Sequence, residues 1–377
     1  MTSSPAISAR ARKLYRSSQG PLIAFGVALV VSTLALIIGG YNPGAAYSAM
    51  IQKLGSVESL AIVINKAVPL FFSAMAVSIG FRMGVFNIGV EGQYLFGAAM
   101  GGVVGAAIHL PGPLHVLIIM ITAMTVSMGW ALIPAWLNVQ RKVNIVISTI
   151  MLNAIAISVI ASLSKTNMFI TTAFRQTRNL PESGRFPNLN TPLGWIGIHL
   201  PVGTQLLGFT VVAIAVGIVY HKVLTRTRFG FDVKATGINP VAARFAGINP
   251  KKMIYIGMAI SGALAGLVGM ATLMEEQYNY KVGEFPPGWG FAGIAVALLA
   301  RDKVPAMAIA AIMFGVLDRA SLGLSNEDVP KELAVIMQGL IILSVVVVYE
   351  VIRRKSQARA VREAAELLMA TSSGAMA

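Results

Sequence analysis

The polar side chains of this sequence gather in two stretches that interrupt long apolar runs. The first stretch is Phe81–Gly97, in which Asn87, Glu91 and Gln93 stand among glycines. A carboxylate at Glu91 favours the positive end of the helix that follows it. Polar backbone inside a membrane must be buried in protein or face a water-filled path, because lipid offers no hydrogen bonds. The stretch therefore predicts a broken-helix corner, which is either structural or the lining of a pathway.

The second stretch, Leu224–Met253, is a polar and basic insert that is predicted to lie at a membrane surface. Gly-Ile-Asn-Pro occurs in it twice, at Gly237–Pro240 and at Gly247–Pro250. Glycine supplies the left-handed residue that ends a helix, asparagine caps the next helix, and proline suits the first helical position. The pattern predicts two short helices followed by a membrane helix.

The middle helix of this insert has an apolar edge. Val241, Phe245 and Ile248 fall at i, i+4 and i+7, and Arg244 stands beside them. An exposed amphipathic helix of this kind suits docking into a groove of a soluble partner. The alternative is a loop helix that lies on lipid headgroups. Docking is the interpretation that we favour.

The sequence lacks the residues of most enzymatic sites. It has no cysteine, which excludes disulfides, thiolate catalysis and cysteine metal sites. It also has no Gly-x-x-x-x-Gly-Lys-Ser/Thr loop for a nucleotide, no nucleophile elbow and no cluster of metal ligands. We therefore expect neither an enzyme nor a cofactor or metal site. Energy for any transport must come from another subunit.

Ionisable residues inside predicted spans would favour an ion-coupled secondary transporter, because such residues are costly in lipid and mark coupling sites. The candidates are Lys66, Glu91 and Asp318, which stand close to predicted span boundaries. Side chains at such positions usually extend toward the interface, and this is the interpretation that we favour for all three. A secondary transporter is thus the alternative from a different class.

Composition and charge indicate an integral membrane protein. Of the 377 residues, 56% are hydrophobic and 12% are charged, whereas average chains have about 25% charged residues. Several apolar runs approach the roughly 20 residues that cross a bilayer as a helix. The net charge of +15 is concentrated in the predicted inner loops, so it indicates topology and not nucleic acid binding.

We predict an all-α, polytopic integral membrane protein with about ten transmembrane helices, some of them broken or short, and both termini in the cytoplasm. Residues 1–20 form a cytoplasmic segment, residues 21–350 the transmembrane domain and residues 351–377 a basic cytoplasmic tail. Residues 224–252 are the cytoplasmic insert. Gly288–Ala300 is too short to cross the membrane comfortably and is predicted to be a half-helix.

Small residues recur at helical spacing in two predicted spans. Gly97, Gly101 and Gly105 do so in one span, and Gly262 and Gly266 in another. Glycines at this spacing let helix backbones approach closely in lipid. Internal packing and dimerisation explain the pattern equally well.

Four segments resemble the permease subunits of bacterial ABC importers. Phe86–Gln93 (Phe-Asn-Ile-Gly-Val-Glu-Gly-Gln) is similar to the branch that works with nucleoside-binding lipoproteins of the basic membrane protein type. That branch lies near the simple-sugar and branched-chain amino acid permeases. Gly237–Ile248 resembles the family's cytoplasmic coupling segment, and Ile147–Asn153 and Gly290–Leu299 resemble two further family segments.

The resemblance implies a permease subunit that translocates nucleosides or related ribosyl compounds across the bacterial inner membrane. It implies a cytoplasmic ABC ATPase, a second permease subunit (a copy of this chain or a related one) and an extracytoplasmic substrate-binding protein as partners, besides membrane lipid. A simple-sugar or branched-chain amino acid permease is the alternative within the class. The implied ATPase-coupling residues are Asp232, Lys234, Gly237, Asn239, Pro240, Ala243, Arg244, Phe245 and Gly247. The implied translocation-pathway residues are Phe86, Asn87, Glu91, Gln93 and Asn153.

Two positions depart from the family pattern. Ile145 stands where the family commonly has glutamate, which removes a charge from a possible pathway helix and leaves the exact substrate open. Lys234 stands where arginine is usual. That change keeps the positive charge and should spare the coupling.

Overall fold

The computed structural model describes residues 26–27, residues 29–324 and, beyond these, residues 330, 336, 337, 339, 340, 343, 344, 347, 348, 351 and 354. The predicted segment 1–20 lies outside the described residues, as does the predicted tail 351–377 apart from residues 351 and 354. The regular structure in the described part of the chain is helical, as predicted, except for one short antiparallel β-hairpin within residues 169–177.

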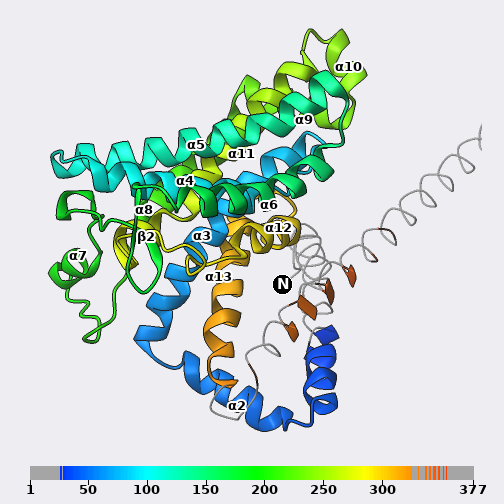
Figure 1. Cartoon of the computed structure of the whole chain (residues 1–377). Coiled ribbons are helices and arrows are strands. Elements are labelled where there is room, and N and C mark those ends of the chain that lie inside the picture. The colour runs from blue at the N-terminus through cyan, green and yellow to red at the C-terminus, as the bar shows by residue number, and fades with distance from the viewer. Residues whose placement is uncertain are drawn as a thin grey trace, which may run out of the picture. The chain divides into compact units, whose positions relative to one another are not determined.

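Figure 1 labels most of the elements along the chain. In order they are α2 (Pro43–Leu54), α3 (Val57–Arg82), α4 (Val90–Ala107), α5 (Gly112–Arg141), α6 (Ile145–Leu163), β1 (Phe169–Thr171), β2 (Arg175–Thr177), the 3₁₀-helix η1 (Glu182–Gly184), α7 (Asn190–Trp195), α8 (Phe209–Arg226), α9 (Arg228–Ile238), α10 (Pro240–Phe245), α11 (Pro250–Val268), the π-helix η2 (Thr272–Glu276), α12 (Trp289–Leu299) and α13 (Val304–Ser321).

Six helical segments in the described part of the chain are long and apolar enough to cross a membrane. They are Val57–Arg82, Gly112–Arg141, Ile145–Leu163, Phe209–Arg226, Pro250–Glu276 and Val304–Ser321. The other predicted spans are α4, the short helix α12, and the first and last apolar runs, both of which lie partly outside the described residues. The prediction that Gly288–Ala300 forms a short helix is confirmed by α12.

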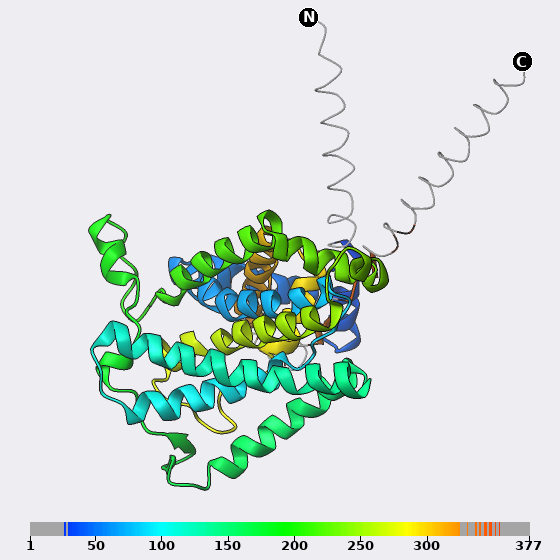
Figure 2. The same ribbon diagram turned by 90° about the horizontal axis from the view of Figure 1, so that it is seen from above.

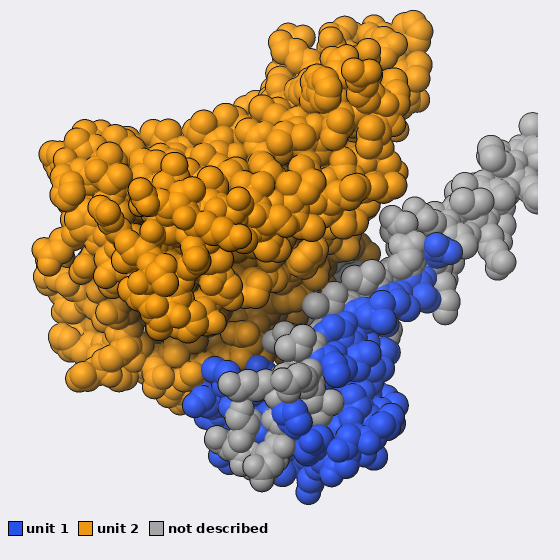
Figure 3. Space-filling view, in the orientation of Figure 1, with its two compact units in different colours: residues 1–53, 320–377 blue, residues 54–319 orange. Residues whose placement is uncertain are grey.

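The chain divides into two compact units, which are coloured separately in Figure 3. One unit combines residues 1–53 with residues 320–377, and its apolar cluster contains Leu36, Ala46, Leu324 and Met337. The other unit is Leu54–Arg319 and contains every residue that was predicted to be functional.

Within the unit Leu54–Arg319, α5 packs against both α4 and α11, and the three helices lie side by side in Figures 1 and 2. A Cβ added to Gly266 of α11 would stand 2.5 Å from the carbonyl oxygen of Ala123 in α5. A Cβ added to Gly97 of α4 would overlap the hydroxyl of Ser127 in α5. The glycine stripes of both helices therefore serve internal packing, because a larger side chain would push these backbones apart.

Figure 1 shows which elements lie at the two ends of this unit. The insert helices α9 and α10 lie at one end, and β2 and α7 lie at the opposite end. The basic insert and the segment between α6 and α8 thus lie at opposite ends of this unit, and a cytoplasmic position of the insert stays a prediction.

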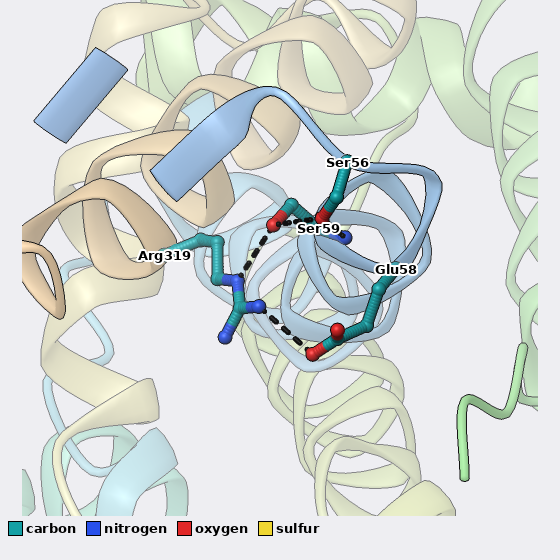
Figure 4. Close-up of polar contacts among 4 residues, drawn as sticks. All are labelled: Ser56, Glu58, Ser59 and Arg319. Carbon is teal, nitrogen blue, oxygen red and sulfur yellow. Dashed lines mark hydrogen bonds and ion pairs between the residues drawn. The ribbon is translucent and has the colours of Figure 1, made fainter. Parts of the chain in front are cut away.

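A buried arginine joins the start of α3 to the end of α13, as Figure 4 shows. Ser56 caps α3, and its hydroxyl accepts the Ser59 N–H at 3.1 Å. The Arg319 guanidinium donates to the Ser59 hydroxyl and to the Glu58 carboxylate, each at 3.0 Å. Both charges suit their helix ends, since carboxylates favour N-termini and guanidinium groups favour C-termini. Beside this contact, the ammonium of Lys66 in α3 lies 3.7 Å from the carboxylate of Asp318, the residue before Arg319, so these residues pair with each other.

Candidate functional site

Asn87 is the centre of the corner between α3 and α4. Its amide nitrogen donates to the Ser261 hydroxyl of α11 at 2.8 Å and to the Gln93 side-chain oxygen at 3.1 Å. Its oxygen accepts the Gly89 N–H at 3.0 Å and the Gln93 side-chain amide at 3.1 Å. Asn87 and Gln93 are both buried. Their side-chain groups bond to other protein groups, as buried polar groups must.

Asn153 of α6 holds the corner from the other side. Its oxygen accepts the Gly92 N–H at 2.9 Å, and its nitrogen donates to the Ile88 carbonyl at 2.9 Å. Four of the five predicted pathway residues, the exception being Phe86, are thus buried at one corner. Phe86 is half exposed, and its ring lies tilted against that of Phe81, with the ring centroids 4.4 Å apart. This geometry is that of a structural corner, and a pathway role of Asn87, Gln93 and Asn153 stays a prediction.

The corner lies deep inside the helical unit. After Arg82 the chain turns back along α3, and the Val85 N–H bonds to the Gly80 carbonyl at 2.9 Å. The Ser261 hydroxyl that contacts Asn87 also donates to the Ala76 carbonyl of α3. At 1.5 Å per residue, Ala76 is roughly 9 Å from the end of α3, and Ser261 is roughly 16 Å from the start of α11. Helix α4 therefore begins away from the ends of α3 and α11, between the two helices.

Glu91 binds a different helix from the one that the sequence suggested. It is 4% exposed, so the expected extension toward the interface is wrong for this residue. Its two carboxylate oxygens accept the Gly288 N–H at 2.7 Å and the Gly290 N–H at 2.8 Å, at the start of α12. The Tyr94 hydroxyl lies 3.3 Å from the carboxylate and donates to the Pro286 carbonyl at 2.7 Å. Glu91 therefore caps α12, although it stands in the first turn of α4.

We predict that Asn87→Ala lowers both the thermal stability of the permease and its transport. The substitution leaves the Gly89 N–H and the Gln93 side-chain amide without their partner, and an unsatisfied buried group costs about 1–3 kcal/mol. Thermal unfolding in detergent and uptake in cells measure the two effects. Phe86→Ala is the control, because that side chain is half exposed. Loss of transport at unchanged stability would instead support a pathway role for Asn87.

The insert folds as its sequence pattern predicted. The Asn239 side chain accepts the Val241 N–H at 2.9 Å and caps α10, and the Asn249 side chain accepts the Lys252 N–H at 3.2 Å and caps α11. Pro240 and Pro250 stand at the first helical positions. Gly247 has the left-handed φ of 79° that ends α10. These local signals fix the positions of two helix starts and one helix end.

Gly237 has another role than the predicted left-handed one. It lies inside α9, and a Cβ added there would overlap the carbonyl oxygen of Arg82 at the end of α3. The glycine is needed because two backbones meet at this point. The insert is thereby packed directly onto the turn that precedes the corner.

An apolar cluster anchors the insert to the transmembrane helices. Val233, Ala243 and Ile248 are buried in it. They pack with residues from the end of α3, from α5 and from the starts of α6 and α11, namely Met83, Val85, Ala131, Ala135, Ile145, Met253 and Met258. Ile248 therefore does not extend the apolar edge of α10, as its spacing had suggested. These apolar contacts fix the insert to the ends of the transmembrane helices.

Phe245 is 91% exposed at the end of α10, and Val241 beside it is also exposed. Figure 1 shows α10 at the tip of this end of the unit. Of the other predicted coupling residues, Ala243 is buried, Asp232 and Gly237 are partly buried, and Lys234, Asn239, Pro240, Arg244 and Gly247 are exposed. An exposed phenylalanine beside a basic residue on an anchored helix is a suitable contact for a folded partner.

Ile145 lies in the same apolar cluster, at the first position of α6. Its departure from the family pattern therefore changes the packing beneath the insert. Ile145 lies at the end of α6 and not in the interior of this helix.

The turn after α12 lies beside the insert. Arg82 donates a hydrogen bond to the Asp302 carbonyl, and Asp302 has a positive φ of 58°. Burial raises the pKa of the Asp302 carboxyl to about 6, against the lowering effect of the Arg82 charge. Arg82 thus contacts both Gly237 of α9 and the turn that follows α12. None of these long-range contacts was visible in the local sequence pattern.

Comparison with known proteins gives consistent matches over most of the chain. The chain is 34% identical over 340 residues to the guanosine ABC transporter permease protein NupP of Bacillus subtilis, covering 88% of this chain and 93% of that protein. It is 29% identical over 353 residues to the nucleoside ABC transporter permease protein NupB of Lactococcus lactis, covering 91% and 95%. It is 33% identical over 333 residues to the glucose ABC transporter permease protein TsgB13 of Haloferax volcanii, covering 86% and 85%.

The family model described as the branched-chain amino acid transport system / permease component matches residues 59–346. This range contains the corner around Asn87, the insert, and helices α4 and α12, whose N-terminal ends meet at Glu91. The chain therefore belongs to the branched-chain amino acid transport system / permease component family.

Proposed function

We propose that the chain is the transmembrane permease subunit of an ATP-driven ABC importer that carries nucleosides or related ribosyl compounds across the bacterial inner membrane. The observation that carries this proposal is the insert: an exposed Phe245 on a short helix whose base is packed into the transmembrane core. A helix mounted in this way can transfer a push from a soluble partner to the spans without being deformed itself. Family membership and the four matching segments support the same function.

The proposal needs partners, because the sequence has no nucleotide-binding loop. A cytoplasmic ABC ATPase binds α10 and hydrolyses ATP. A second permease subunit, either a copy of this chain or a related one, completes the translocation path. An extracytoplasmic binding protein delivers the substrate at the end that carries α7 and the β-hairpin.

Nucleosides are the favoured substrates because two of the relatives, from two bacterial species, are named for guanosine or nucleoside transport. A sugar is the second candidate, since one relative is named for glucose. Both substrate classes are uncharged, which agrees with spans that contain few charged residues. The charge pattern alone does not discriminate between them.

Uptake by whole cells tests the proposal. We expect that deleting the gene abolishes accumulation of labelled guanosine or uridine and that excess unlabelled nucleoside, but not glucose or leucine, competes in the wild type. Accumulation should persist when an uncoupler collapses the proton gradient at constant ATP. Loss of glucose uptake with normal nucleoside uptake would move the chain to the sugar branch. Collapse with the uncoupler at constant ATP would favour a secondary transporter.

A further inference from the structure

Helix α12 is a half-helix that starts inside the membrane and ends at its inner edge. Its 11 residues span roughly 16 Å, about half of the hydrocarbon core. At its start, the Gly290 carbonyl accepts the Ser73 hydroxyl of α3 at 3.4 Å, and Ser73 is roughly 14 Å from the end of α3. Beyond its other end, the Asp302 carbonyl accepts a hydrogen bond from the side chain of Arg82, the last residue of α3.

Helix α4 starts at the same point and runs in the opposite direction. A Cβ added to Gly290 would overlap the backbone nitrogen of Glu91, so the first turns of α12 and α4 touch. The far end of α4 lies at the outer side, where the Gly105 carbonyl is 2.8 Å from the His115 ring nitrogen. The two helices therefore meet N-terminus to N-terminus inside the membrane.

Such a junction is electrostatically unfavourable without a counter-charge. Each helix N-terminus carries the equivalent of roughly half a positive charge, and the surroundings have a low dielectric constant. The Glu91 carboxylate occupies this place: it belongs to the first turn of α4 and accepts two N–H groups of α12. One buried side chain thus serves both helix ends.

We propose that Glu91 is the positioning residue that holds α12 and α4 end to end, and that transport is coupled to ATP hydrolysis through this junction. The inference rests on the proposed function. A second observation at the inner end of α12 supports the inference. There the Arg82 side chain contacts the turn at Asp302, and the Arg82 carbonyl packs against Gly237 of the insert. A displacement of α9 and α10 by the ATPase would pass from Arg82 to the turn at Asp302 and reach the Glu91 junction along α12.

Glu91→Gln in the reconstituted full complex tests this inference. Glutamine keeps the size of the side chain, but one of its two terminal atoms becomes an NH2 group that cannot accept the N–H of Gly288 or Gly290. We expect the complex to assemble and to hydrolyse ATP, while nucleoside taken up per ATP falls at least tenfold. Unchanged uptake per ATP would overturn the inference.

Glu275→Gln is the matched control, because Glu275 has the same chemistry at another helix. Its carboxylate is buried and accepts the Gly208 N–H at 2.6 Å and the Phe209 N–H at 2.9 Å, at the start of α8. We expect this variant to lose thermal stability while uptake per ATP stays within about twofold of the wild type, since Glu275 binds the start of α8, and the insert follows the other end of that helix. An equal fall of uptake per ATP in both variants would show a general structural effect and overturn the inference.

Glu91→Ala with and without formate keeps the test decisive if the glutamine variant does not assemble. A small carboxylate can occupy the space that the side chain leaves and accept the same two N–H groups. We expect formate to restore uptake per ATP in this variant and to leave the wild type unchanged. Restored assembly without restored coupling would contradict the inference. A wild-type complex that does not accumulate nucleoside would instead contradict the proposed function.

Discussion

Replacing Phe245 by aspartate is expected to abolish recovery of an ATPase subunit with the purified permease, while the permease itself stays inserted and folded. The side chain is 91% exposed, so it contributes little to the fold of its own chain. Central aromatic residues of an interface commonly account for about 2 kcal/mol or more, which is an affinity loss of about 30-fold or more. A carboxylate in the same groove adds the penalty of burying an unpaired charge. Arg244→Glu should act in the same direction through its neighbouring charge.

Co-purification followed by an ATPase assay measures this effect. Trp195→Asp is the matched control, because Trp195 is 82% exposed and lies on α7, at the opposite end of the same unit. The control should retain the ATPase. Recovery of an active ATPase with Phe245→Asp in wild-type amounts would show that α10 is not the docking helix, and would favour a helix that lies on lipid headgroups.

Gly237→Ala is expected to destabilise the permease and to weaken ATPase binding at the same time. The new Cβ would overlap the Arg82 carbonyl oxygen, and a backbone atom cannot turn aside as a flexible side chain can. Forcing one extra carbon into a packed contact costs about 1–3 kcal/mol. Helix α9 must then shift away from the end of α3, which disturbs the base of α10.

Gly129→Ala is the matched control for this substitution. Gly129 lies within α5, and a Cβ added there meets no atom within 4 Å. The same change should therefore leave stability unchanged or raise it by up to about 1 kcal/mol, since alanine is the better helix former. Thermal unfolding of the two variants in detergent makes the comparison. Equal stability of Gly237→Ala and the wild type would mean that α9 does not need its contact with Arg82.

The insert was predictable from the sequence because its signals are local. Asn239, Pro240 and Gly247 act on their immediate neighbours, so their spacing alone places the start and the end of α10, and Asn249 places the start of α11 in the same way. The half-helix α12 was predictable for a similar reason, since its apolar run is visibly too short to span the membrane. The exposure of Phe245 follows from a short helix at the tip of a polar insert.

The contacts that join these elements were not predictable from the sequence. Glu91 and Gly288 are separated by 197 residues, and Gly237 and Arg82 meet only after α9 has packed onto α3. Sequence spacing assigned Glu91 to its own helix because α4 is the nearest N-terminus. It assigned Ile248 to the exposed edge of α10 because helical periodicity does not include the chain turn at Gly247. In each case a tertiary contact decided the outcome against a local preference.

The close packing of α5 between α4 and α11 limits how this permease can move. Where helix backbones touch through glycines, there are few side chains to adopt a second arrangement, and packed interfaces switch between discrete states more readily than they deform. We therefore expect the three helices to move as one rigid block during each transport cycle. Elements that contact their neighbours through side chains are better able to rearrange. One example is α8, in which the Tyr220 hydroxyl lies 2.7 Å from the Ser78 hydroxyl of α3.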